Sequence, residues 1–133
     1  MKTRFHKHYT REEARQLLPQ IANWLIQLAD LRDRSARFDR RLETLLEGGA
    51  DVGGETVNGW LRVTVSYRDT LREFEQRQLQ LKDLDRGLVD FPAILRGREV
   101  FLCWEQGEED IEYWHELDGG FAGREPLTNA GGG

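Results

Sequence analysis

Apolar residues in the first half of the chain recur at alternating spacings of four and three. They are Leu17, Ile21, Trp24, Leu28, Leu31, Phe38, Leu42 and Leu45, with Ser35 at the single polar position. This heptad pattern predicts a long helix with one apolar stripe. Thr10 and Glu13 match a capping box, so we expect the helix to begin just after Thr10. Pro19 is expected to kink the first turns without ending the helix.

A second helical pattern extends from about Thr56 to Leu84, after a glycine-rich turn at 48–54. Its stripe consists of Trp60, Val63, Tyr67, Thr70, Phe74, Leu81 and Leu84. The two helical segments have similar lengths, so we expect them to fold back on each other as an antiparallel, coiled-coil-like hairpin.

The hydrophobic period changes to two after residues 85–87. The pattern predicts three strands, at Leu88–Phe91, Glu99–Glu105 and Asp110–Glu116. With Glu105 opposite Asp110, the expected register places His115 on the face that carries Val100, Leu102 and Trp104. Residues 109–117 have a short helix as an alternative, but their β-forming side chains favour a strand.

These patterns together predict an α+β fold in one domain over residues 1–128. A long antiparallel two-helix hairpin (10–84) precedes a small antiparallel β-meander with a glycine-rich loop (85–128), and residues 129–133 form a disordered tail.

Charge and composition narrow the functional class. The net charge of -5 over 133 residues and the pI near 5.3 argue against nucleic-acid binding and against binding to an anionic membrane surface. Cys103 is the only cysteine, which excludes an internal disulfide and cysteine-cluster zinc sites. Neither a signal peptide nor a membrane span is recognisable, so we expect a reduced, cytoplasmic protein.

Several short motifs carry a resemblance to a known family. They are Tyr9-Thr10-Arg11-Glu12-Glu13-Ala14, Leu17-Leu18-Pro19, Gly87-Leu88-Val89-Asp90-Phe91-Pro92, Val100-Phe101-Leu102-Cys103-Trp104, Gly107-Glu108, Trp114-His115-Glu116 and Gly120-Phe121-Ala122-Gly123-Arg124. In these motifs the chain resembles an uncharacterised prokaryotic family, the domain of unknown function numbered 2203. The resemblance implies a bacterial source and the order of helices before strands. It implies no activity, cofactor or catalytic residue.

Candidate chemistry lies after Gly87, because the hairpin contains no histidine or cysteine. Asp90, His115 and Glu116 are candidates for acid–base chemistry or for a metal site. If residues 109–117 were helical, Glu112 would join His115 and Glu116 on a weak metal-binding face.

Arg124, with Gly120 and Gly123 in the glycine-rich loop, is the candidate for binding an anion. The structural alternative is that Arg124 pins the loop through a salt bridge to Asp90 or Glu116, and that His115 is an ordinary strand-end residue. Cys103 has no basic residue beside it in the sequence, which favours a small buried hydrophobe over a nucleophile.

Trp60, Tyr67 and Phe74 are spaced seven residues apart and are candidates for the hairpin core or for a protein–protein interface. The second helix carries two adjacent apolar stripes, whereas one partner helix covers only one of them. We therefore expect a non-catalytic, self-associating interaction or scaffold module, with a homodimer favoured. The alternative is a small-ligand or divalent-metal-binding protein, or an enzyme, with its site at Asp90, His115, Glu116 and Arg124. No cofactor is strongly implied.

Overall fold

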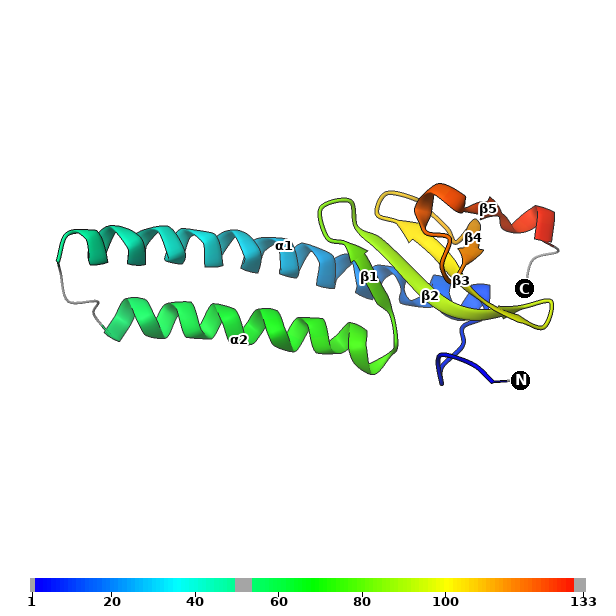
Figure 1. Ribbon diagram of the computed structural model, residues 1–133, viewed down its shortest axis with the longest axis horizontal. Coiled ribbons are helices and arrows are strands. Elements are labelled where there is room, and N and C mark those ends of the chain that lie inside the picture. Colours follow the sequence, from blue (N-terminus) through cyan, green and yellow to red (C-terminus); the bar gives the residue numbers. More distant parts are fainter. Residues whose placement is uncertain (1, 50–53, 131–133) are drawn as a thin grey trace.

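The computed structural model describes residues 2–49 and 54–130 and consists of two long helices followed by a small sheet (Figure 1). The helices are α1 (Arg11–Glu47) and α2 (Gly54–Gln76). The strands are β1 (Gln80–Asp83), β2 (Leu88–Leu95), β3 (Arg98–Glu105), β4 (Tyr113–Glu116) and β5 (Glu125–Pro126). They pair antiparallel in chain order. The predicted α+β class, with a helical hairpin before an antiparallel sheet, is confirmed.

The start of α1 agrees with the sequence pattern. The Glu13 amide donates to the Thr10 hydroxyl at 3.1 Å, and the Thr10 amide donates to the Glu13 carboxylate at 2.9 Å. This reciprocal pairing satisfies two amides that the first helical turn leaves without partners. The helix then continues through Pro19 and ends at Glu47, before Gly48. The next predicted feature is the glycine-rich turn at 48–54, and its residues 50–53 lie outside the part of the chain that the structure describes.

The end of α2 differs from the prediction, because the helix stops at Gln76 and Gln80–Asp83 forms a strand. Gln78 adopts a left-handed backbone with φ of 57°. The amides of Gln78 and Leu79 donate to the carbonyls of Glu75 and Phe74, at 3.0 Å each, which is the hydrogen-bond pattern of a Schellman motif. Glycine is the usual residue at the left-handed position, and glutamine there gives no stop signal in the sequence.

The pairing of β3 with β4 also differs from the prediction. Phe101 lies opposite His115 and Leu102 opposite Trp114, so the register is displaced by one residue. The connection covers residues 106–112 and is longer than expected. Within it, the Trp104 indole N–H donates to the Glu108 carbonyl at 2.9 Å. A displacement of one residue transfers every side chain of a strand to the other face. His115 therefore lies on the other face of the sheet from Val100 and Leu102. The prediction of a strand rather than a helix at this place is confirmed over β4.

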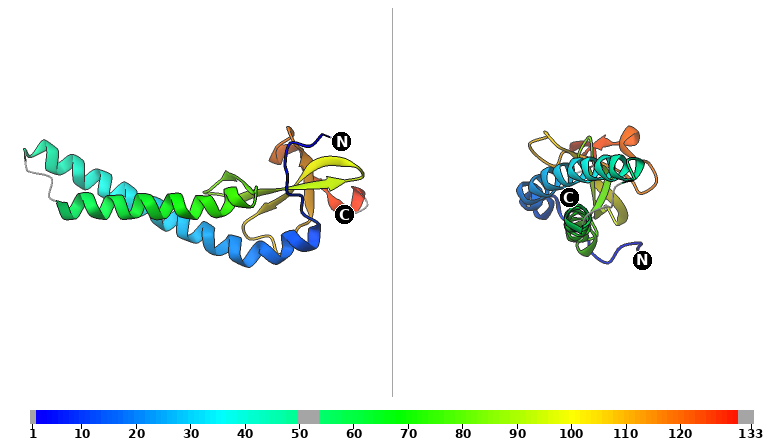
Figure 2. Two further views of the ribbon diagram at one scale, coloured as in Figure 1. Left: turned by 90° about the horizontal axis from the view of Figure 1, so that it is seen from below. Right: turned by 90° about the vertical axis from the view of Figure 1, so that its left-hand side faces the viewer.

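The hydrophobic core lies between α1 and one face of the sheet. Its members include Leu18, Ile21, Leu25 and Leu28 from α1, Val89, Phe91 and Ala93 from β2, and Val100, Leu102 and Trp104 from β3. At the junction with α2, the Trp24 ring packs on the Phe74 ring with centroids 5.4 Å apart. The sheet occupies one end of the hairpin, and the opposite end of both helices projects away from it (Figures 1 and 2).

Two short 3-10 helices complete the chain, η1 (Phe121–Gly123) and η2 (Leu127–Ala130). The backbone of η2 extends into the predicted disordered tail, of which residues 131–133 lie outside the described part. Within the described residues, neither helix combines the length and hydrophobicity that crossing a bilayer requires.

Candidate functional site

Three neighbouring strands bring an aspartate, a cysteine and a histidine together on the face of the sheet that is turned away from α1. Asp90 of β2 pairs with Cys103 of β3, and His115 of β4 pairs with the adjacent Phe101. Each residue is 1–2% exposed, so the three polar side chains are fully buried. Their potential ligand atoms all lie within 4.8 Å of one another. We call Asp90, Cys103 and His115 the buried cluster.

The hydrogen bonds of His115 define its protonation. Its Nδ1 lies 2.6 Å from the Glu116 carbonyl, which only accepts hydrogen bonds, so Nδ1 carries a proton. Its Nε2 lies 3.0 Å from the Asp90 carboxylate, which also accepts when it is ionised. Burial lowers the pKa of His115, but its hydrogen bonds to Asp90 and the Glu116 carbonyl, together with the nearby Cys103 side chain, outweigh burial and raise the pKa to about 10. At neutral pH His115 is therefore an imidazolium.

Arg124 covers the cysteine side of the buried cluster. Its Nη1 donates to the Cys103 Sγ at 3.9 Å, and its guanidinium forms an ion pair with Glu108. The guanidinium carbon lies 3.7 Å from the Tyr113 ring centroid and 4.4 Å from that of Phe121. These contacts hold the arginine in place over the thiol. The sulfur of Cys103 thus lies beside a guanidinium that can donate to it.

The structure places the other predicted site residues differently. Arg124 is paired with Glu108, and not with Asp90 or Glu116 as the sequence suggested. Glu116 is exposed and forms an ion pair with Arg98. Glu112 is exposed in the connection before β4. Gly120 and Gly123 are exposed around η1, where the Gly123 amide donates to the Gly120 carbonyl. Of the predicted acid–base set, the structure thus brings only Asp90 and His115 together.

Cys103 is the member of the cluster that sequence reasoning missed. The prediction that it is buried agrees with the structure. No basic residue lies beside it in the sequence, but the fold brings His115 and Arg124 from distant positions close to its sulfur. The sequence could have revealed this only through the register of the β3–β4 pairing, which decides the face of the sheet on which each side chain lies. Moving the β3–β4 pairing by one residue places His115 on the Cys103 face.

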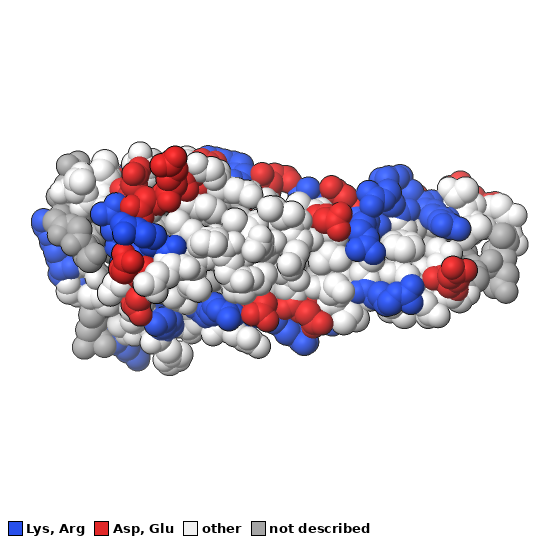
Figure 3. Space-filling model, turned by 180° about the vertical axis from the view of Figure 1, so that it is seen from behind, with Lys and Arg blue, Asp and Glu red and all other residues white. Residues whose placement is uncertain are grey.

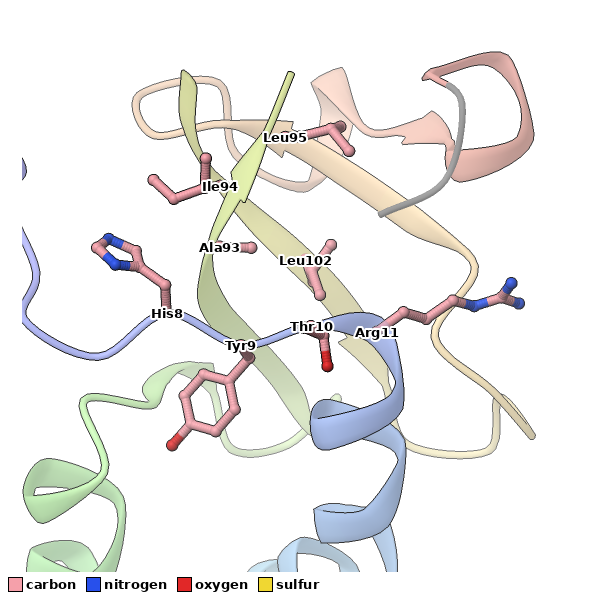
Figure 4. A pocket seen from close by; sticks show the side chains of 8 residues that line it. All are labelled: His8, Tyr9, Thr10, Arg11, Ala93, Ile94, Leu95 and Leu102. Atoms are coloured by element: carbon pink, nitrogen blue, oxygen red, sulfur yellow. The ribbon is translucent and has the colours of Figure 1, made fainter. Parts of the chain in front are cut away.

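A separate cavity of about 140 Å³ lies between the start of α1 and the end of β2 (Figure 4). Its lining is mostly apolar: His8, Tyr9, Thr10, Arg11, Ala93, Ile94, Leu95 and Leu102. The polar side chains are already engaged. His8 pairs with Glu99, the Tyr9 hydroxyl donates to the Arg77 carbonyl, and Thr10 caps α1. Arg11 extends away from the cavity toward Asp110. The polar side chains that line the cavity thus already have partners within the chain.

The three interface candidates on α2 divide between the two ends of the hairpin. Phe74 is buried against Trp24, so it belongs to the core. Trp60 and Tyr67 lie farther from the sheet and are only half-buried. The prediction of an interface at Trp60 and Tyr67 thus concerns surface that the chain itself leaves partly open.

The comparison with known families gives one match. The model of the uncharacterized conserved protein family DUF2203 matches residues 7–127, and the chain therefore belongs to this family. No curated protein and no solved structure matches the chain.

Proposed function

We propose that this protein is a non-catalytic, self-associating interaction module whose contact surface is the outer hairpin, defined as residues 33–47 and 54–66. The observation that carries the proposal is the incomplete burial of this region. Among the large apolar side chains of the outer hairpin, only Val63 is buried. Leu46, Leu61 and Val65 are 65%, 45% and 55% exposed, while Phe38, Leu42, Leu45 and Trp60 are half-buried. Several exposed or half-buried large apolar side chains in one region are typical of an interaction site.

The geometry of a two-helix hairpin explains the open surface. Each helix can turn one stripe toward its partner, and the sheet covers a second stripe only near its own end. Leu61 and Val65 are four residues apart, so they lie on one side of α2 and form a second stripe. Between the helices, a hollow of about 310 Å³ lined by Ala36, Thr64 and Tyr67, among others, adds a recess beside this region. A second hairpin packed alongside would complete a four-helix bundle.

The charge distribution favours a second copy of this chain as the partner. The outer hairpin carries five arginines (Arg34, Arg37, Arg40, Arg41 and Arg62) and five carboxylates (Asp33, Asp39, Glu43, Glu47 and Glu55). In a two-fold contact the same surface meets itself, so a strongly charged surface would repel its copy. The balanced outer hairpin avoids this repulsion, although the whole chain carries -5. Figure 3 shows charges of both signs mixed along the margins of one face of the molecule.

The alternative is a small-ligand or divalent-metal site, or an active site, formed by Asp90, His115, Glu116 and Arg124. It has less support as a set, because ion pairs with Arg98 and Glu108 already engage Glu116 and Arg124. Asp90 and His115 remain as a pair, and they are buried.

The test is the oligomeric state of the full chain, measured by sedimentation equilibrium over a wide concentration range. We expect a dimer that the double variant Leu61→Glu/Val65→Glu converts to a folded monomer. Ile26→Glu is the matched control, because Ile26 is also an exposed apolar residue of the hairpin but lies outside the outer hairpin. A wild-type chain that stays monomeric throughout contradicts the proposal, as does a dimer that the double variant leaves intact.

A further inference from the structure

We propose that Asp90, Cys103 and His115 form a binding site for a divalent transition-metal ion, with Zn²⁺ as the ion that best fits the ligands. The three residues come from three adjacent strands, and their carboxylate oxygen, thiol sulfur and imidazole nitrogen lie within 4.8 Å of one another. Zn²⁺ accepts this mixture of nitrogen, sulfur and oxygen ligands, whereas Mg²⁺ and Ca²⁺ prefer oxygen alone. This inference does not depend on self-association, since all three residues lie in the sheet.

The distances between the three ligand atoms are close to those of an occupied zinc site. Zn²⁺ binds its ligands at about 2.0–2.3 Å, which places the ligand atoms of a tetrahedral site roughly 3–4 Å apart. The Nε2 of His115 and the Asp90 carboxylate already lie at 3.0 Å, and no ligand atom is farther than 4.8 Å from another. Small side-chain rotations would bring the sulfur into range.

His115 is oriented as metal-binding histidines usually are. The Glu116 carbonyl accepts the Nδ1 proton at 2.6 Å, so Nε2 is the nitrogen that faces the other two ligands. A backbone carbonyl on the outer nitrogen is a typical second contact of a metal-bound imidazole, because it fixes both the ring orientation and the tautomer. The metal would take the place of the Nε2 proton that the Asp90 carboxylate now accepts.

The charges around the cluster can accommodate the ion. Bound Zn²⁺ would be balanced by the Asp90 carboxylate and the Cys103 thiolate, with His115 neutral. Nearby Arg124 is itself balanced by Glu108 and donates to the sulfur at 3.9 Å. A guanidinium donor to a metal-bound thiolate is an outer contact that stabilises the thiolate. With the ion bound, the site therefore carries no net charge, which satisfies the requirement that buried charges be compensated.

The single cysteine of the chain makes the test specific. Co²⁺ bound to a thiolate gives a thiolate-to-metal charge-transfer band in the near ultraviolet, and only Cys103 can supply the thiolate. We titrate the chelator-treated full chain with CoCl₂, follow this band, and then displace Co²⁺ with ZnCl₂. The expected result is one equivalent of Co²⁺ per chain with the band present, and loss of the band on adding Zn²⁺.

Two variants complete the design. Cys103→Ser should abolish the band and weaken Zn²⁺ binding by more than about 100-fold. This exceeds the loss of about 10–100-fold expected when a residue contacts only a ligand and not the metal. The control His6→Gln/His8→Gln removes the two other histidines of the chain and should bind as the wild type does. Binding without the charge-transfer band, or binding lost in the control, would show a site at the N-terminal histidines and overturn the proposal. Absence of binding to the folded wild-type chain would overturn it too, so the decision does not depend on whether Cys103→Ser folds.

Discussion

The sheet end and the outer hairpin contain similar apolar side chains but bury them to very different extents. We define the sheet end as the five strands together with residues 11–32 of α1. There, Phe91 and Val100 are completely buried, because α1 covers the sheet and α2 supports α1. In the outer hairpin, Phe38 and Trp60 are half-buried, because each helix has only the other helix as a neighbour. The burial of these residues therefore depends on how many layers of secondary structure pack around them, and not on their hydrophobicity.

The same contrast applies to polar groups. The sheet end encloses the Asp90–His115 pair, for which removal of one partner would leave a buried charge uncompensated. Most ion pairs of the hairpin, such as Arg34 with Asp30, are exposed and contribute little stability. The sheet end thus has little tolerance for change, whereas the outer hairpin can adapt to a partner.

The largest expected effect comes from truncating equivalent rings in the two regions. Phe91→Ala should lower the free energy of unfolding by about 3–5 kcal/mol, because it empties a fully buried site. Phe38→Ala should lower it by only about 1 kcal/mol, because half of that ring already contacts water. Urea unfolding followed by circular dichroism, at one low protein concentration, measures both. Equal losses would show that the two regions are packed alike.

Substitution of one glycine in each region by alanine compares the two regions through a smaller change in side-chain volume. Gly87 has φ of +67°, and an added Cβ would lie 2.5 Å from the Gln106 Cβ. Gly87→Ala should therefore cost about 2–4 kcal/mol, from the left-handed backbone and the steric overlap.

Gly59 is the matched position in the outer hairpin, where an added Cβ would lie 2.8 Å from the Phe38 Cζ. The half-buried ring can move aside, and alanine in a helix gains about 0.5–1 kcal/mol over glycine. We expect Gly59→Ala to change the unfolding free energy by less than about 1 kcal/mol. A loss as large as that of Gly87→Ala, in the same unfolding experiment, would contradict a loosely packed outer hairpin.

The last comparison concerns a second histidine–carboxylate pair, which is less enclosed than Asp90–His115. Glu99 accepts hydrogen bonds from His8 at 2.7 Å and from the amides of Arg4 and Phe5 at 2.6 and 3.0 Å. Burial raises the pKa of Glu99, but these donors together lower it below the ordinary value of 4.5. Glu99→Gln should reduce stability at neutral pH by about 1–3 kcal/mol, because it removes the acceptor charge.

The pH dependence follows from the direction of that shift. A carboxyl group with a lowered pKa in the folded state stabilises the protein above its unfolded pKa, and the stabilisation is lost as the pH falls. Wild-type stability should therefore decrease more steeply below about pH 4.5 than the stability of Glu99→Gln. Urea unfolding across this pH range gives the comparison, and parallel curves would exclude a contribution from Glu99.

Local signals in the sequence predicted most of the fold. The capping box at Thr10 and Glu13, the heptad stripe and the alternating strands are all encoded by residues close together in the chain. The prediction of where α2 ends was wrong, because Leu81 and Leu84 continue the heptad spacing while Gln78 adopts a left-handed backbone without being glycine. Two of the three residues of the buried cluster, Asp90 and His115, were also predicted from the residue types.

The sequence by itself thus determined the order and type of the elements and the location of the candidate chemistry after Gly87. Only the tertiary structure decided which side chains meet. The Trp104 indole N–H donates to the Glu108 carbonyl within the 106–112 connection, and β4 pairs with β3 one residue away from the predicted register. Because strand side chains alternate between faces, that single displacement places His115 beside Cys103 instead of in the hydrophobic core. Likewise, only the position of the sheet at one end of the hairpin determines which part of the apolar stripe stays open to a partner.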